Sequence, residues 1–94
     1  MPIRSFSDPE AKRVFSGQFS KRLPREIQRK ALEKLRQLNA ALVLSDLRLP
    51  PSNRLHALEG DRLGQFSISI NRQWRICFRF DKGDVYDVVI VDYH

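Results

Sequence analysis

Two neighbouring stretches of the sequence alternate between apolar and polar residues, and this pattern limits the possible folds more than any other feature. The stretches are 65–71 and 74–80, and only Asn71-Arg72-Gln73 connects them. A period of two predicts β-strands with one buried face, and so short a connection predicts an antiparallel hairpin. The apolar positions are Phe66, Ile68, Ile70, Trp74, Ile76, Phe78 and Phe80.

Further strands are predicted on both sides of this hairpin. A short strand begins near Leu55 and ends before a turn at Gly60-Asp61, and residues 85–94 form the last strand after a second turn at 81–84. The last strand is apolar on both faces from Val88 to Val91, which predicts an interior strand of the sheet. Residues 3–6 are predicted to form a short first strand.

Two helices are predicted before the sheet. The first follows Ser7, which has capping-box spacing with Glu10, although Asp8-Pro9 offers a competing cap. The second covers 23–42, because its apolar residues recur at helical spacing. These residues are Ile27, Ala31, Leu35, Leu38 and Leu42. A loop containing Pro50-Pro51 follows the second helix.

The expected fold is therefore α+β, with one domain over 1–94 and the order β-α-α-β-β-β-β. The two N-terminal helices are predicted to pack on the apolar face of a twisted, mostly antiparallel sheet. An arginine between apolar neighbours in a strand should point away from the core. Arg75 and Arg79 should therefore line the open, concave face of the sheet together with Ser67 and Ser69.

The chain is strongly basic, with a net charge of +6 and a sequence pI of about 10.1. This charge favours a polyanion or an acidic protein as partner, although a basic surface also serves solubility. Residues 21–36 hold seven basic residues against two acids, so the second helix has either a solvated outer face or a face that docks on RNA phosphates. The lone Cys77 is expected to be a buried, inert thiol.

The sequence contains no long apolar segment and no signal-peptide pattern at its start, so a cytoplasmic protein without a membrane partner is expected. The spacings typical of metal ligands, phosphate-binding glycine loops and the GxSxG nucleophile motif are absent. We therefore expect no metal and no cofactor.

Cleavage of an RNA phosphodiester needs only side chains that this sequence contains. A base must deprotonate the 2′-hydroxyl, a cation must stabilise the phosphorane, and an acid must protonate the departing 5′-oxygen. His56 and His94 can supply both proton transfers, and Arg75 can bind the phosphate. Tyr93 can stack on a base, and Asp92 can orient an imidazole.

Each of these residues also has a purely structural interpretation. His56, between leucines, is more often a structural hydrogen-bonding group, and Tyr93 can close the edge of the core. Arg75 can pair with Asp87 or Asp92 across the sheet. Taken singly, each structural interpretation is the more common one; taken together on a basic fold with a free sheet face, the residues point to RNA.

The segment RLHALEGDRLGQFSISINRQWRICFRF and the terminal VDYH resemble the HigB group of toxins in the RelE and ParE superfamily. The resemblance covers essentially the whole chain. It implies a RelE-like fold and a toxin that cuts translated mRNA in the A site of the 70S ribosome and so inhibits translation. It also implies a HigA-like helix-turn-helix antitoxin as partner, and operator DNA bound through the toxin–antitoxin complex.

Carried over by position, the site of these toxins falls on His56, Arg75, Asp92, Tyr93 and His94. Glu59 stands where these toxins often have a lysine, which removes one phosphate-binding cation and adds an anion. Arg62 or Arg54 can compensate, and Arg79 completes the set of expected substrate-binding residues.

Two other functions remain open from the sequence. One is a ParE-like inhibitor that binds DNA gyrase without chemistry, for which the two histidines are incidental. The other is a weakly active or inactive antitoxin-binding module, of which Glu59 would be a sign.

Overall fold

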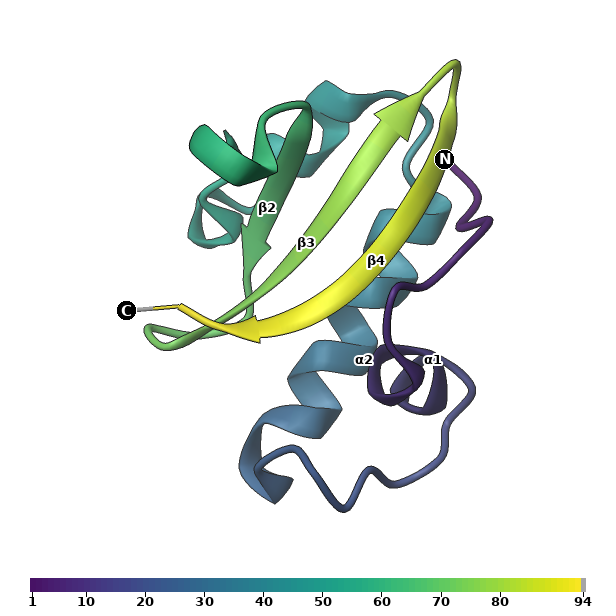
Figure 1. Cartoon of the computed structure of the whole chain (residues 1–94), viewed down its shortest axis with the longest axis vertical. Helices are drawn as coiled ribbons and strands as arrows, with labels where there is room; N and C mark the ends of the chain where they lie inside the picture. The colour runs from purple at the N-terminus through teal and green to yellow at the C-terminus, as the bar shows by residue number, and fades with distance from the viewer. Residues whose placement is uncertain (94) are drawn as a thin grey trace.

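The structure is a computed structural model, and it describes residues 1–93. These residues form two α-helices followed by one four-stranded antiparallel sheet in the order β1-β2-β3-β4 (Figure 1). The predicted α+β arrangement is confirmed. The elements are α1 (Pro9–Phe15), α2 (Arg25–Ala40), β1 (His56–Ala57), β2 (Gln65–Ser69), β3 (Trp74–Asp81) and β4 (Asp84–Asp92), with 3-10 helices η1 (Leu44–Arg48), η2 (Pro51–Asn53) and η3 (Gly60–Arg62) between them.

The N-terminal segment differs from the prediction. Instead of a regular first strand, it forms two isolated parallel bridges to β4, from Ile3 to Val85 and from Phe6 to Val88. In the order of the named strands β4 is the last, but the N-terminal segment hydrogen-bonds to its outer edge at Val85 and Val88. The prediction that β4 is an interior strand is therefore correct for its first half and wrong for its second half. Its apolar residues are nevertheless covered, since the N-terminal segment pairs with its first half and α1 packs against it.

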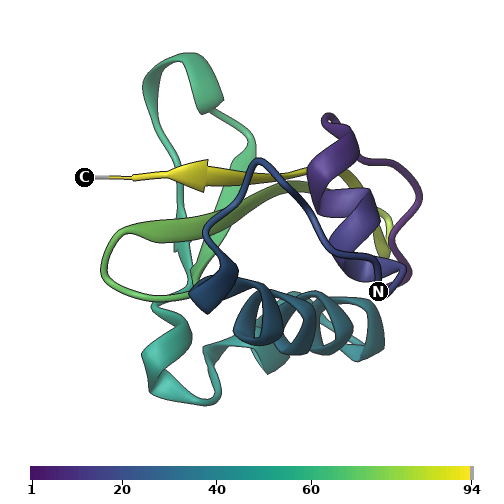
Figure 2. The ribbon, with the colours of Figure 1, turned by 90° about the horizontal axis from the view of Figure 1, so that it is seen from below.

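Both helices lie on the apolar face of the sheet, and Figure 2 shows α2 beneath the strands. Asp8 caps α1 by accepting hydrogen bonds from the backbone N–H groups of Glu10 and Ala11, so the Asp8-Pro9 alternative is the one that the structure uses. The predicted apolar face of α2 is correct from Ile27 to Leu38. Leu42 is an exception, because α2 ends at Ala40 and this side chain is 84% exposed.

The connection between α2 and β1 is fastened by one buried side chain. Asn53 is fully buried, and its amide nitrogen donates to the backbone carbonyls of Leu47 (3.1 Å) and Leu49 (3.2 Å). Its amide oxygen accepts a hydrogen bond from the Lys34 ammonium group of α2. Burial lowers the pKa of Lys34, and the nearby Lys30 lowers this pKa further. The 3-10 segments are thereby tied to the helix, and Arg54 follows directly from this anchored point.

Leu35 tests the packing of α2 against the sheet. Its side chain is fully buried, so we expect Leu35→Asp to lower the free energy of unfolding by about 3–5 kcal/mol, since it leaves a cavity and an unpaired carboxylate in the core. Leu42→Asp, which makes the same chemical change at an exposed position, should change it by less than about 0.5 kcal/mol. Urea unfolding of both variants measures the difference. Equal stabilities would contradict the packing.

Candidate active site

The strand pairing brings small and polar side chains together on the face of the sheet away from the helices. His56 pairs with Ser67, Ser67 pairs with Cys77, and Cys77 pairs with Val89 across the four strands. Residues that are directly opposite each other on paired strands share a face. Cys77 is buried as predicted, and burial raises the pKa of its thiol, so at neutral pH this side chain is a neutral thiol rather than a nucleophilic thiolate.

Arg75 is held in a fixed orientation on this same face. Its Nε donates to the hydroxyl oxygen of Ser67 (2.9 Å), and its Nη2 donates to the backbone carbonyl oxygen of Arg54 (2.7 Å). Arg54 adopts a left-handed backbone conformation (φ 47°), where η2 ends. A guanidinium group carries five N–H donors, and these two contacts leave the others for an anion. The arginine is therefore oriented before any ligand binds.

Tyr93 lies over the guanidinium of Arg75. The Arg75 Cζ atom is 5.5 Å from the centroid of the tyrosine ring, a cation–π contact, and the Tyr93 backbone N–H donates to the carbonyl of Gln73 (2.6 Å). The ring is 43% exposed, so Tyr93 is positioned by the end of β4 but still has an accessible surface. Tyr93 is therefore too exposed to act as a residue that closes the edge of the core.

A cavity of about 420 Å³ lies beside this tyrosine. Its lining includes His56, Arg62 and Tyr93, together with Ala57, Leu58 and Glu59. The His56 side chain is exposed at this cavity rather than buried between the neighbouring leucines. Glu59 lines the same cavity. The glutamate that replaces the lysine common in these toxins therefore places an anion in the same cavity as the histidine. Arg62 brings one cation to the same wall, and its Nη1 donates to the Gln65 amide oxygen (3.3 Å).

Asp92 occupies a different position from Tyr93. It pairs with Trp74 of β3, and its carboxylate accepts a hydrogen bond from the side-chain amide of Gln73 (3.0 Å). Because successive side chains of a strand point to opposite faces, Asp92 points away from the face that carries Val91 and Tyr93. The proposed role of His94 lies outside the described residues.

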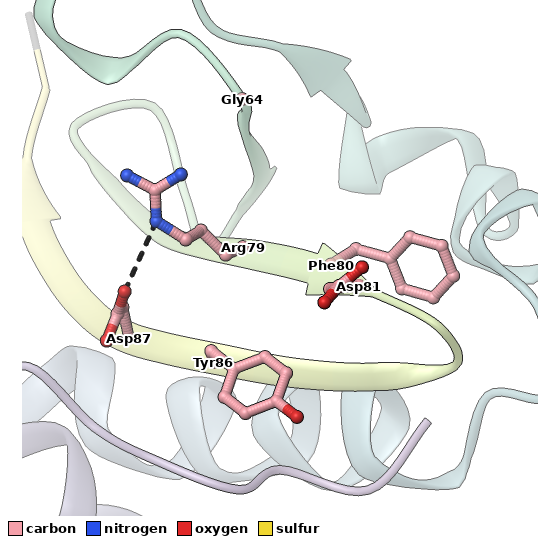
Figure 3. Close-up of a pocket in the computed structure, with 6 residues that line it drawn as sticks. All are labelled: Gly64, Arg79, Phe80, Asp81, Tyr86 and Asp87. Carbon is pink, nitrogen blue, oxygen red and sulfur yellow. Dashed lines mark ion pairs between the residues drawn. The ribbon is translucent and has the colours of Figure 1, made fainter.

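Arg79 lines a second hollow of about 490 Å³, shown in Figure 3. Its guanidinium forms an ion pair with Asp87 (3.3 Å), and Tyr86 and Gly64 border the same space. The sequence alternative that pairs Arg75 with Asp87 is therefore wrong, because Asp87 contacts the other arginine of β3. The hollow of Arg79 is separate from the cavity that His56 and Tyr93 line.

Three features of this site were missed in the sequence. Ser67 and the backbone carbonyl of Arg54 orient Arg75, and Asn53 anchors the loop that presents this carbonyl. Ser67 was noted only as a polar residue on the open face. Among residues 1–93, no group of three or more histidine, cysteine or carboxylate side chains is arranged to hold a metal ion.

Comparison with known proteins identifies the family. Residues 4–94 match the model of the HigB-like toxins, described as RelE-like toxins of the type II toxin–antitoxin system HigB. The chain belongs to the HigB-like toxin family. The resemblance seen in the sequence is confirmed, and the site described above is the candidate active site of a HigB-like toxin.

Individual relatives agree with this assignment. The chain is 43% identical to Toxin HigB-1 of Vibrio cholerae over 65% of its own length and 64% of that protein. It is 32% identical to Endoribonuclease HigB of Proteus vulgaris over 98% of its length and 99% of that protein. The structure of YafQ from Escherichia coli matches 96% of this chain and 90% of its own, with a TM-score of 0.60 and 15% identity, which supports the fold.

Ser67 tests whether the serine orients Arg75. We expect Ser67→Ala to lower the free energy of unfolding by about 1–2 kcal/mol, because the Arg75 Nε–H loses its acceptor. The Nε–H proton of Arg75 should also exchange faster with solvent, which NMR measures. Ser69→Ala is the matched control, because its hydroxyl donates to the Asn71 carbonyl (2.7 Å) and not to Arg75. An unchanged exchange rate in Ser67→Ala would contradict the orienting role.

Proposed function

We propose that this HigB-like toxin is a ribosome-dependent endoribonuclease that cuts translated mRNA in the A site and thereby inhibits translation. The observation that carries the proposal is the arrangement of Arg75, which is held between Ser67 and the Arg54 carbonyl beneath the Tyr93 ring. The same Tyr93 ring lines a cavity that has the exposed His56 in its wall. The Proteus vulgaris relative is an endoribonuclease by name, which supports RNA cleavage as the reaction.

The proposed reaction is an attack by the RNA on its own backbone. A histidine removes the proton of a 2′-hydroxyl, the 2′-oxygen attacks the adjacent phosphorus, and the bond to the 5′-oxygen breaks. The second histidine donates a proton to the departing 5′-oxygen. His56 and His94 are the proposed pair, and the order in which they act stays open. The products are a 2′,3′-cyclic phosphate and a 5′-hydroxyl, and the reaction requires no cofactor.

Arg75 is proposed to stabilise the charge that develops on the phosphorane. Its remaining N–H donors are already oriented, so little reorganisation is needed when the charge appears. Tyr93 is proposed to stack on a base next to the scissile bond, using its exposed ring. Asp92 is proposed to act indirectly: its hydrogen bond with the Gln73 side chain helps to hold the end of β4, which carries Tyr93.

The other arginines are proposed to bind the RNA backbone. Arg62 is the best placed, because it lines the same cavity as His56 and Tyr93. Arg54 is exposed, and its backbone carbonyl holds Arg75. Arg79 must leave an exposed ion pair with Asp87, which costs little. Glu59 weakens phosphate binding at the cavity, and Arg62 offsets part of this repulsion.

The proposed partners follow from membership of a toxin–antitoxin family. They are a HigA-like helix-turn-helix antitoxin, the 70S ribosome with its mRNA, and operator DNA bound through the antitoxin complex. The cytoplasm is the proposed location of the protein. Within residues 1–93, the helices are too short and too polar to cross a membrane.

Arg75 is the first test of the proposal. Arg75→Ala should lower single-turnover cleavage of mRNA on programmed ribosomes by about 10²–10³-fold, because a charge-stabilising group is lost. Arg75→Lys should recover only part of this loss, since an ammonium group cannot make forked contacts. Arg13→Ala, which removes an exposed arginine of α1, is the control and should cleave at the normal rate. Normal cleavage by Arg75→Ala would reject the assignment.

His94 is the second test. It follows the apolar run of residues 88–91, so His94→Gln should leave the thermal melting temperature unchanged. If this imidazole transfers a proton, cleavage should fall by about 10²–10⁴-fold. Ribosome binding, measured by co-sedimentation, should stay the same. A variant that cleaves like the unaltered protein would remove His94 from the mechanism.

A further inference from the structure

A network of buried polar side chains immediately precedes the residue whose carbonyl holds Arg75. Its centre is Asn53 in η2, which is fully buried and has both polar atoms of its side chain hydrogen-bonded. The amide oxygen accepts from the ammonium group of Lys34, which is also buried, and the amide nitrogen donates to the carbonyls of Leu47 and Leu49. Because burying an amide or an ammonium group is costly without hydrogen bonds, these contacts hold η2 firmly against α2.

A second side chain of α2 reinforces the network. The Gln37 amide nitrogen donates to the Leu49 carbonyl (2.5 Å), and its amide oxygen accepts from the Asn53 amide nitrogen (3.3 Å). Lys34 and Gln37 are three residues apart, so they lie on the same side of the helix. The end of η2 is therefore fixed from two points of α2.

Arg54 follows this fixed end in a backbone conformation that an L residue rarely adopts. Its φ is 47° and its ψ is 50°, in the left-handed region, and its N–H donates to the Pro51 carbonyl (3.1 Å). Such a conformation persists only where the surrounding structure enforces it. In this conformation the Arg54 carbonyl accepts a hydrogen bond from the Arg75 Nη2 (2.7 Å).

The Arg54 carbonyl is one of two groups that fix the plane of the Arg75 guanidinium. The Ser67 hydroxyl holds Nε, and the Arg54 carbonyl holds Nη2. With the Nε contact alone, the planar group could turn, and its other N–H donors would lose their direction. Donors stabilise a developing charge most effectively when they are aimed before the charge appears.

We propose that Asn53, supported by Lys34, is a positioning residue for RNA cleavage, because it holds Arg54 in the conformation that places its carbonyl on the Arg75 guanidinium. The inference rests on the proposed function, in which Arg75 stabilises the phosphorane. Asn53 and Lys34 are buried, so neither contacts the RNA. The network should therefore act on the rate of the chemical step and not on ribosome binding.

The test compares two variants of the network with two controls. Asn53→Ala removes the amide, and Lys34→Met removes the ammonium group but keeps an unbranched side chain of similar length. Asn39→Ala is the matched control, because the Asn39 amide oxygen anchors a different segment by accepting from the Ile3 backbone N–H (2.9 Å). Val14→Ala, on the buried side of α1, controls for lost stability alone. Thermal melts define a temperature at which every variant is folded.

Single-turnover cleavage of mRNA on programmed ribosomes gives the rates. Asn53→Ala should lower the maximal rate by about 10–100-fold, the scale of a misplaced catalytic group. Lys34→Met should lower it by only about 3–10-fold, because Asn53 keeps its two carbonyl acceptors. The ribosome concentration at the half-maximal rate should change by less than about 2-fold in both variants, and both controls should cleave within about 2-fold of the unaltered chain.

A double variant separates positioning from general stabilisation. If Asn53 acts only through Arg75, the combination of Asn53→Ala with Arg75→Ala should cleave no more slowly than Arg75→Ala alone. A residue that only stabilises the fold would add its own loss. NMR of the free protein gives a second readout: the Arg75 guanidinium should turn faster about its Nε–Cζ bond in Asn53→Ala than in Asn39→Ala.

Three results would overturn the inference. They are equal cleavage by Asn53→Ala and Asn39→Ala, a double variant in which the two losses multiply, and unchanged rotation of the Arg75 guanidinium. If Asn53→Ala does not fold, Lys34→Met decides, and both its cleavage rate and its Arg75 signal must change. Failure of the unaltered chain to cleave mRNA would reject the proposed function alone, because the NMR signal of Arg75 still decides whether Asn53 positions it.

Discussion

The structure depends on the alternation of side chains in β2, β3 and β4. Burying Ile68, Ile76 and Phe78 under the helices requires their neighbours to face the other side. Ser67 and Arg75 are therefore diagonal neighbours on the same face of adjacent strands, without any loop to place them there. Because a one-residue shift of register would exchange the two faces, the burial of the core also fixes the geometry of the candidate site.

Core packing alone does not orient the guanidinium of Arg75, and a second support comes from the connection after α2. The buried Asn53 ties this connection to Lys34 of α2 and to two backbone carbonyls, and the next residue presents its own carbonyl to Arg75. The orientation of the proposed catalytic cation is thus linked to a polar contact on the helical side. Loss of that contact would disturb the orientation of Arg75 without altering any side chain of the candidate site.

The two sides of the molecule carry different surfaces. The face of β2–β4 away from the helices carries the cavity with His56 and the exposed ring of Tyr93, whereas a smaller apolar hollow lined by Val14, Phe19 and Leu32 lies between the helices. A partner on the helical side need not enter the cavity.

The sequence by itself determined the two helices, the central hairpin and most of the proposed chemistry. Its apolar periods predicted the helices and the hairpin, and its few chemically suitable residues pointed to His56, Arg75 and Tyr93. Only the tertiary structure decided how Arg75 is held, that Arg79 pairs with Asp87, and that the N-terminal segment covers only the first half of the outer edge of β4. The sequence could not predict these contacts, because every residue carries a backbone carbonyl and many side chains carry a charge. Only the path of the chain selects which of these groups come within hydrogen-bonding distance.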